Sequence, residues 1–233
     1  MIKTVLNWSS GKDAALAYHM LQQGKRYEVT TLLTTVNQDA TRIMMHGVRE
    51  EMLDLQAERM NIPLVKVNLP ASPDDSLYAA AMQKALDELK GEGIRSSAFG
   101  DIRLEDLRKY REGQLKQAEF EAVFPLWGTG SLELVQMIEQ TGIEAVIVCV
   151  NEKYLGREFL GRKVDAALLA ELPANVDPCG EYGEFHTYVY NAPYFSRPIA
   201  WRSGEIVHKV YTHENVGTPW DKGFFFMDVL PAI

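Results

Sequence analysis

Residues 5–21, VLNWSSGKDAALAYHML, begin as an apolar run, break at small polar residues and resume with apolar residues at helical spacing. The first part predicts a buried strand and the second an amphipathic helix. Lys12 stands at the start of that helix, where the helix dipole disfavours a cation unless an anion lies in front of it. Because phosphate groups bind well at helix N-termini, the stretch predicts a strand–loop–helix site for a phosphate-bearing ligand.

Strand-like and helix-like segments alternate through the first half of the chain. The expected strands are 2–8, 28–36, 64–67, 97–99 and 122–126, and the expected helices are 12–23, 48–60, 74–89 and 104–117. Alternation with short links predicts an α/β fold, a parallel sheet with helices on both faces. Ligands on such sheets bind at the carboxyl ends of the strands, and residues 9–13 follow the first strand.

The pattern changes after residue 128. Helices are expected over 131–141 and 163–172, with a strand over 145–150 between them. From Pro173 onward, Gly, Pro and Asn turns separate short alternating runs, including 206–211 and 224–229, which indicates antiparallel strands. We therefore expect two domains, an α/β domain over residues 1–128 and a smaller α+β domain over residues 129–233.

Composition narrows the classes of partner and location. A formal net charge of −8 argues against a broad nucleic-acid-binding surface, so no nucleic-acid partner is expected. Cys149 and Cys179 lack metal-ligand spacing and are predicted to be reduced thiols. We see no signal peptide and no apolar run of about 18 residues, so we expect a cytoplasmic protein without a membrane partner. The oligomeric state is not indicated, and a homodimer stays open.

The loop at residues 9–13 fits neither of the commonest phosphate-binding motifs. A Walker A loop needs four residues between its first glycine and Gly-Lys-Ser/Thr, and a Rossmann Gly-x-Gly-x-x-Gly is absent. What remains is Ser-x-Gly-Lys-Asp directly between a strand and a helix. The simpler alternative is an ordinary helix cap by Ser10 beside an exposed lysine.

The sequence SSGKDA, residues 9–14, resembles the Ser-Gly-Gly-Lys-Asp-Ser loop of the N-type ATP pyrophosphatases, also called PP-loop or adenine nucleotide alpha hydrolase-like proteins. The resemblance implies a HUP-type sheet and cleavage of ATP between its α and β phosphates. By motif position, residues 9–13 would surround the pyrophosphate. Two departures stand out, since Ser10 replaces a glycine and Ala14 replaces the final serine.

A second dense stretch is DPCGEYGEFHT, residues 177–187. Without further information it reads equally well as a glycine-bent hairpin with a solvated acidic face, or as carboxylates that hold magnesium or an amine. The stretch resembles the Glu-x-Gly-Glu-Phe/Tyr-x-Thr signature of the diphthine–ammonia ligase family, in the form of its short bacterial-type members. Other segments resemble that family in the same order, namely LLTTVN (32–37), MMHGVREEML (44–53), AFGDIRLEDLRKYRE (98–112) and FPLWG (124–128).

The resemblance implies an ATP-dependent ligase that joins a carboxylate and ammonia into an amide and releases AMP and pyrophosphate. The implied cofactors are ATP and Mg²⁺, and the implied partners are a small-molecule or protein carboxylate and ammonia. The motifs and the resemblance together select Lys12, Glu181 and Glu184 for catalysis, Ser9, Ser10, Gly11, Lys12, Asp13, Thr34, His46, Gly100 and Asp101 for ATP, Asp13 and Asp101 for the metal, and Trp127, Glu181, Glu184, His186 and Thr187 for the substrate.

Several of these residues have simpler alternatives. Asp101 fits an N-cap of the following helix, Trp127 fits core packing, and His46 fits a cap of the second helix. Two other functions also stay open, a PP-loop enzyme that modifies tRNA and a non-catalytic ATP- or AMP-binding protein. The second of these is favoured by Ala14, which lacks the hydroxyl of the family's loop.

Overall fold

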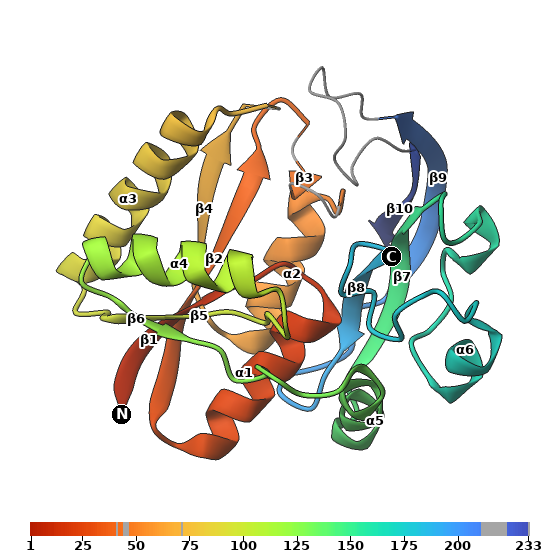
Figure 1. Ribbon diagram of the computed structural model, residues 1–233, viewed down its shortest axis with the longest axis horizontal. Helices are drawn as coiled ribbons and strands as arrows, with labels where there is room; N and C mark the ends of the chain where they lie inside the picture. The colour runs from red at the N-terminus through yellow and green to blue at the C-terminus, as the bar shows by residue number, and fades with distance from the viewer. Residues whose placement is uncertain (41, 44–46, 71, 211–222, 233) are drawn as a thin grey trace.

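The computed structural model describes residues 1–40, 42–43, 47–70, 72–210 and 223–232. Figure 1 shows two sheets side by side, a helix-flanked sheet built from the first half of the chain and a second sheet built from the other half. The predicted fold class is confirmed, because the first sheet is mostly parallel and the second is antiparallel. The domain boundary at residue 128 stays a prediction.

The first sheet has β1 at its centre. Its strands are β1 (Ile2–Asn7), β2 (Tyr27–Asn37), β3 (Arg42–Ile43), β4 (Leu64–Leu69), β5 (Ser96–Ala98) and β6 (Glu121–Val123). β1 pairs in parallel with β2 on one side and with β5 on the other, β2 continues to β4, and β5 continues to β6. The chain therefore runs outward from β1 and returns to its other side, which makes the β1–β5 junction the switch point where ligands of such sheets bind.

Four helices cover the two faces of this sheet, α1 (Lys12–Gly24), α2 (Glu50–Met60), α3 (Asp75–Gly91) and α4 (Glu105–Gln117). Side chains alternate between the faces along each strand. Leu32 of β2 packs in the core cluster that contains α1 and α2, whereas the next residue, Leu33, packs in the cluster that contains α3 and α4. Both clusters are buried, which is why the strands read as nearly continuous apolar runs.

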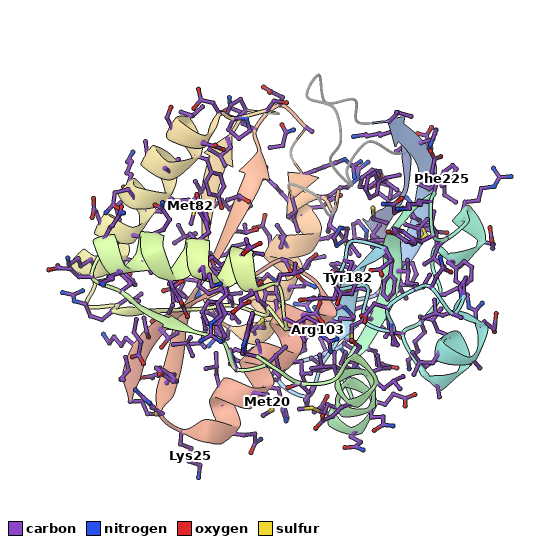
Figure 2. The ribbon with its side chains drawn as sticks, viewed as in Figure 1. Met20, Lys25, Met82, Arg103, Tyr182 and Phe225 are labelled. Atoms are coloured by element: carbon purple, nitrogen blue, oxygen red, sulfur yellow. The ribbon has the colours of Figure 1, made fainter. Side chains whose placement is uncertain are left out.

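The second sheet is antiparallel, with the order β8-β7-β10-β9. Its strands are β7 (Glu144–Asn151), β8 (Phe185–Asn191), β9 (Trp201–Val210) and β10 (Gly223–Pro231). The helices of this half are α5 (Ser131–Thr141), the 3₁₀ helix η1 (Arg157–Phe159) and α6 (Ala166–Glu171). In Figure 2, Met82 on α3 and Phe225 on β10 mark opposite sides of the molecule.

Helices α1 and α2 lie between the two sheets and share one core cluster with β7 and β8. Polar contacts join the same layers. The Tyr188 hydroxyl donates to the Met52 carbonyl at 3.2 Å, and Asp228 of β10 accepts bonds from Arg42 and Arg49. Because the second sheet packs on α1, it is held in a fixed position beside the loop that connects β1 to α1.

Periodicity places most elements within a few residues of their observed ends. It missed the two-residue strand β3, and the helix expected over 163–172 is the shorter α6. Residues 206–210 of the strand expected over 206–211 belong to β9, and residue 211 lies outside the described part of the chain. None of the helices in the described ranges is both long and apolar enough to cross a lipid bilayer.

Candidate active site

The loop between β1 and α1 has an unusual backbone. Ser10 has φ of 69°, in the left-handed region that favours glycine, which is the residue that the resembling loops have there. Gly11 is the N-cap residue of α1 and supplies no side-chain cap. The Ser10 side chain is fully buried, and its hydroxyl has no hydrogen-bond partner among the described residues. The predicted exposed-lysine alternative fails as well, since Lys12 is only 2% exposed.

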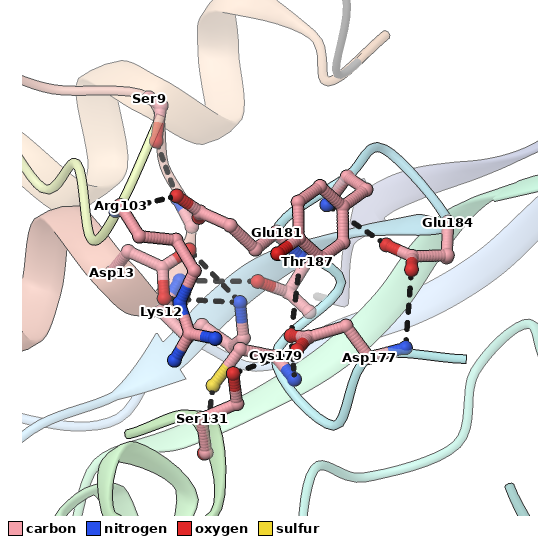
Figure 3. Close-up of polar contacts among 12 residues, drawn as sticks. Ser9, Lys12, Asp13, Arg103, Ser131, Asp177, Cys179, Glu181, Glu184 and Thr187 are labelled. Carbon is pink, nitrogen blue, oxygen red and sulfur yellow. Dashed lines mark hydrogen bonds and ion pairs between the residues drawn. The ribbon is translucent and has the colours of Figure 1, made fainter. Parts of the chain in front are cut away.

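The second half of the chain supplies the missing cap. The backbone N–H of Lys12 donates to the Thr187 hydroxyl at 3.0 Å, as Figure 3 shows. The N–H of Val189 donates to the Ser10 carbonyl at 2.9 Å. We call residues 177–187 the acidic stretch. Strand β8 begins within it and belongs to the second sheet, and it therefore stabilises the loop that follows β1 of the first sheet.

The ammonium group of Lys12 lies beside acidic side chains. Its Nζ lies 2.8 Å from one carboxylate oxygen of Asp13 and 3.0 Å from the other. Burial alone would lower the pKa of Lys12, but the negative charge of Asp13, with smaller contributions from Cys179 and Glu181, raises it above its ordinary value. The site therefore holds a buried cation, stabilised by neighbouring negative charge, next to the helix N-terminus.

The residues after β5 lie against this loop. A Cβ on Gly100 would come within 2.8 Å of the Asp13 carbonyl carbon, so the close approach requires glycine. Asp101 forms an ion pair with Arg111 at 3.2 Å and caps no helix, because Leu104 is the N-cap residue of α4. Burial raises the pKa of Asp101, Arg111 opposes that rise, and the charge of Asp13 adds to it, so the two carboxylates interact.

Among the described residues, no group of three or more His, Cys, Asp and Glu side chains is arranged to hold a metal by itself. Mg²⁺ usually takes one or two carboxylates and completes its shell with waters and phosphate oxygens. The Asp101 oxygen that faces Arg111, Oδ2, is buried and accepts no hydrogen bond among the described residues, and the charge of Asp13 acts on the same carboxyl group. The pair therefore fits an ion that is shared with bound phosphates.

The two glutamates of the acidic stretch point in different directions (Figure 3). Glu181 accepts a bond from the backbone N–H of Arg103 at 3.0 Å and lines the cavity beside Lys12. Burial raises the pKa of Glu181, the Arg103 N–H opposes that rise, and Asp13 adds to it. Glu184 is 2% exposed and accepts the backbone N–H groups of Asp177 and Tyr182 instead.

The remaining polar groups of this stretch are poorly suited to proton transfer near neutral pH. Burial, with a smaller contribution from Lys12, lowers the pKa of His186 to about 4, so its imidazole is neutral. The Cys179 thiol donates to the Ser131 carbonyl at 3.0 Å, and burial raises its pKa to about 12. Both cysteines are unpaired and buried, so neither is an activated nucleophile.

These groups surround a cavity of about 830 Å³. The predicted site residues on its wall are Ser9, Gly11, Lys12, Asp13, Thr34, Gly100, Asp101, Glu181, His186 and Thr187. The wall does not include Ser10, Glu184 or Trp127, and the Trp127 ring instead lies under the Arg108 guanidinium at 4.5 Å. His46 lies outside the described residues. The roles assigned to all of these residues stay predictions.

Comparisons with known proteins match both halves of the chain to one family. Residues 2–117 match the diphthamide synthase N-terminal domain, and residues 131–216 match the diphthamide synthase C-terminal domain. The chain belongs to the diphthamide synthase family. The predicted resemblance is thereby confirmed.

Individual relatives of this family member are distant. Diphthine–ammonia ligase of Bos taurus is 27% identical over 70% of this chain and 67% of its own length. Diphthine–ammonia ligase of Rattus norvegicus is 24% identical over 85% of this chain and 82% of its own. A solved structure of the U34-tRNA thiolase NcsA from Methanococcus maripaludis with its 4Fe-4S cluster is 18% identical, with a TM-score of 0.37 over 59% of this chain and 56% of that one. A TM-score this low supports no conclusion about function.

Two residues near the site of this diphthamide synthase family member were not foreseen from sequence. The buried Gln56 donates to the carbonyls of Ser10 and Val189 and accepts from the Trp8 indole at 2.8 Å, so it holds the loop to both sheets. A polar residue at position 56 on the apolar stripe of α2 is the signal that could have marked it. Arg111 on α4 also lines the cavity, and its place among the alternating charges of residues 103–112 did not mark it as a site residue.

Proposed function

We propose that the protein is an ATP-dependent ligase that forms an amide from a carboxylate and ammonia. A carboxylate oxygen attacks the α-phosphorus of ATP, the bond to the β-phosphate breaks, and pyrophosphate leaves. Ammonia then attacks the acyl carbon, and AMP leaves with the carboxylate oxygen. Ammonium gives up one proton before the attack and a second as the amide forms, so one base near the acyl group is needed.

The observation that carries the proposal is the buried, charged Lys12 at the N-terminus of α1. Leaving pyrophosphate accumulates negative charge, and a preorganised cation with backbone N–H groups stabilises such charge in a site that excludes water. The same loop has the family's sequence except at Ser10 and Ala14. The left-handed backbone of Ser10 supports the family's loop shape despite the first departure, since the residue adopts the glycine-like conformation.

Asp13 and Asp101 are the residues proposed to hold Mg²⁺ together with the phosphates. A bound ion of this kind offsets phosphate charge and orients the nucleotide. In the structure the Lys12 ammonium donates to both carboxylate oxygens of Asp13. With the ion bound, Asp13 would contact both the metal and Lys12.

Glu181 is the group best suited to take the proton from ammonium. Its raised pKa brings it closer to neutral pH than an ordinary carboxylate, whereas His186, with a pKa of about 4, is a weaker base. Glu184 is proposed as a positioning residue, because both of its oxygens hold backbone N–H groups of the loop that presents Glu181.

The test is the fate of ATP labelled at its α-phosphate. The protein is incubated with labelled ATP, Mg²⁺ and ammonium, with and without a small-metabolite extract or purified elongation factor 2, and AMP is measured against ADP. AMP that depends on one added fraction supports the proposal and leads to the substrate by fractionation. Formation of ADP would contradict it. ATP binding without any product would indicate the non-catalytic nucleotide-binding protein that Ala14 favours.

A further inference from the structure

The cavity extends beyond residues 9–13, which we call the phosphate loop. It continues between α3 and α4, on the face of the parallel sheet opposite α1. Apolar side chains dominate this part, and we call the space that they line the α3–α4 arm. They are Ala79, Met82 and Leu86 on α3, and Leu107 and Leu115 on α4, and the wall also includes Tyr78, Gln83, Tyr110 and Gln114 of the same helices. Met82 is labelled in Figure 2, on the side of α3 that faces this region of the molecule.

One cation stands where the arm meets the phosphate loop. Arg111 pairs with Asp101 through one of its terminal nitrogens at 3.2 Å, and its guanidinium lies 4.3 Å from the centre of the Phe99 ring. A guanidinium has five N–H donors arranged as a fork that fits a carboxylate. The ion pair with Asp101 uses one terminal nitrogen of Arg111, so other N–H groups of the guanidinium can bind a second carboxylate.

The arm and the loop are adjacent but chemically different. Gly100, directly before Asp101, lies against the backbone of Asp13 at the loop, so Arg111 stands near the phosphate site. The loop offers Lys12, carboxylates and a helix N-terminus, which suit phosphate and metal. The arm offers mainly apolar side chains, with hydroxyl and amide groups of two tyrosines and two glutamines among them, so its main contribution to binding is the burial of apolar surface.

We infer that the α3–α4 arm binds the body of the carboxylate substrate, a small acid with an aliphatic or aromatic body, with its carboxylate on Arg111. This inference rests on the proposed ligase function and names its substrate class. Apolar burial supplies affinity in the arm, while Arg111 directs the carboxylate toward the α-phosphate at the loop. A carboxylate at the end of a polar protein segment would gain little from these apolar walls.

The test is calorimetric binding of acetate, butyrate, hexanoate and 3-phenylpropionate to the full chain saturated with α,β-methylene-ATP and Mg²⁺. We expect affinity to rise about fourfold for each methylene group that the arm buries. Equal affinity for acetate and hexanoate would overturn the inference. The analogue is not cleaved, so the measurement does not depend on turnover.

Matched variants locate the binding. Leu107→Glu and Met82→Glu place a charge in the arm and should weaken hexanoate binding at least tenfold, while Leu77→Glu, on the same helix as Met82 but off the cavity wall, should not. Leu77 and Leu107 are 45% and 36% exposed, so both variants should fold. Arg111→Gln should also weaken binding about tenfold, and Arg108→Gln, which removes an arginine that faces Trp127, should not.

Failure of the inference and failure of the proposed function give different results. If the carboxylic acids bind in the arm but no AMP forms from ATP, the inference about the arm is supported and the proposed ligase chemistry is contradicted. AMP formation with a substrate whose binding ignores Leu107→Glu and Met82→Glu would contradict the arm alone. If those variants instead weaken binding of the ATP analogue about tenfold, the arm holds the nucleotide base and the inference is wrong.

Discussion

The phosphate loop and the acidic stretch use their charged side chains in opposite ways. In the loop, residues 9–13, the backbone is held by other parts of the chain, while Lys12 and Asp13 form an ion pair that lines the cavity. In the acidic stretch, residues 177–187, Asp177 and Glu184 bind backbone N–H groups of the stretch itself. Only Glu181 of its three carboxylates lines the cavity. A high density of acidic residues therefore does not indicate an equal number of reactive ones.

The two regions also depend on each other. Thr187 at the end of the acidic stretch caps the helix that follows the loop, and Glu181 reaches the backbone of Arg103 in the first half. We expect changes to the groups that face the cavity to reduce turnover. Changes to the groups that bind backbone should reduce stability first.

Lys12→Met should have the largest effect. Removing one preorganised group that stabilises developing charge costs about 10²–10³ in rate, and Lys12 is the buried cation at the helix N-terminus. Single-turnover AMP formation measures this loss, with circular dichroism to establish that the fold persists. A folded variant with wild-type turnover would show that the loop does not act on the leaving pyrophosphate.

Glu181→Gln should reduce AMP-coupled amide formation about a hundredfold, the size of a typical general-base contribution. Glu184→Gln is the matched comparison: it should lower stability, and it should reduce the activity of the folded fraction far less than Glu181→Gln does, because Glu184 only positions the loop. The wild-type rate should fall as pH drops through the raised pKa of Glu181, because protonation removes the base. The Glu181→Gln variant should lack that decline. Equal losses of activity in both variants would contradict the assigned roles.

Asp228→Asn tests the ionic contact between β10 and the first half. Burial raises the pKa of Asp228, but hydrogen bonds from Arg49 and Arg42 outweigh it and lower the pKa below its ordinary value. The stabilisation is therefore complete above the unfolded-state pKa of about 4 and is lost as pH falls below it. Urea unfolding should show a loss of about 1–3 kcal/mol between pH 5 and 8 that shrinks below pH 4. A difference independent of pH would indicate a packing effect alone.

Thr187→Val should have the smallest effect. The variant keeps the shape of the side chain but removes the oxygen that accepts the N–H of Lys12. Loss of a helix cap costs about 1 kcal/mol, which thermal unfolding should detect. Because Val189 and Gln56 still hold the Ser10 carbonyl, ATP binding should weaken only a few-fold. A complete loss of ATP binding would mean that the hydroxyl contacts the nucleotide itself.

Sequence predicted the features that local patterns determine. Alternating strands and helices indicated the parallel sheet and a ligand site at the carboxyl ends of its strands. The strand order, which was not predicted, brings the residues after β1 and β5 to one site. Position in the acidic stretch did not separate Glu181 from Glu184, because both belong to one motif and the difference is the direction of each side chain. Gln56 and the Thr187 cap join residues more than a hundred positions apart, which no local pattern records.

The most direct test of acyl-adenylate chemistry follows an oxygen atom. The carboxylic acid that supports turnover is prepared with ¹⁸O in both carboxyl positions, and the AMP released in the presence of ammonium is analysed by mass spectrometry. Attack of the carboxylate on the α-phosphorus predicts one ¹⁸O atom in each AMP. Unlabelled AMP would mean that another nucleophile cleaves ATP at the loop, and the proposed ligase mechanism would be wrong.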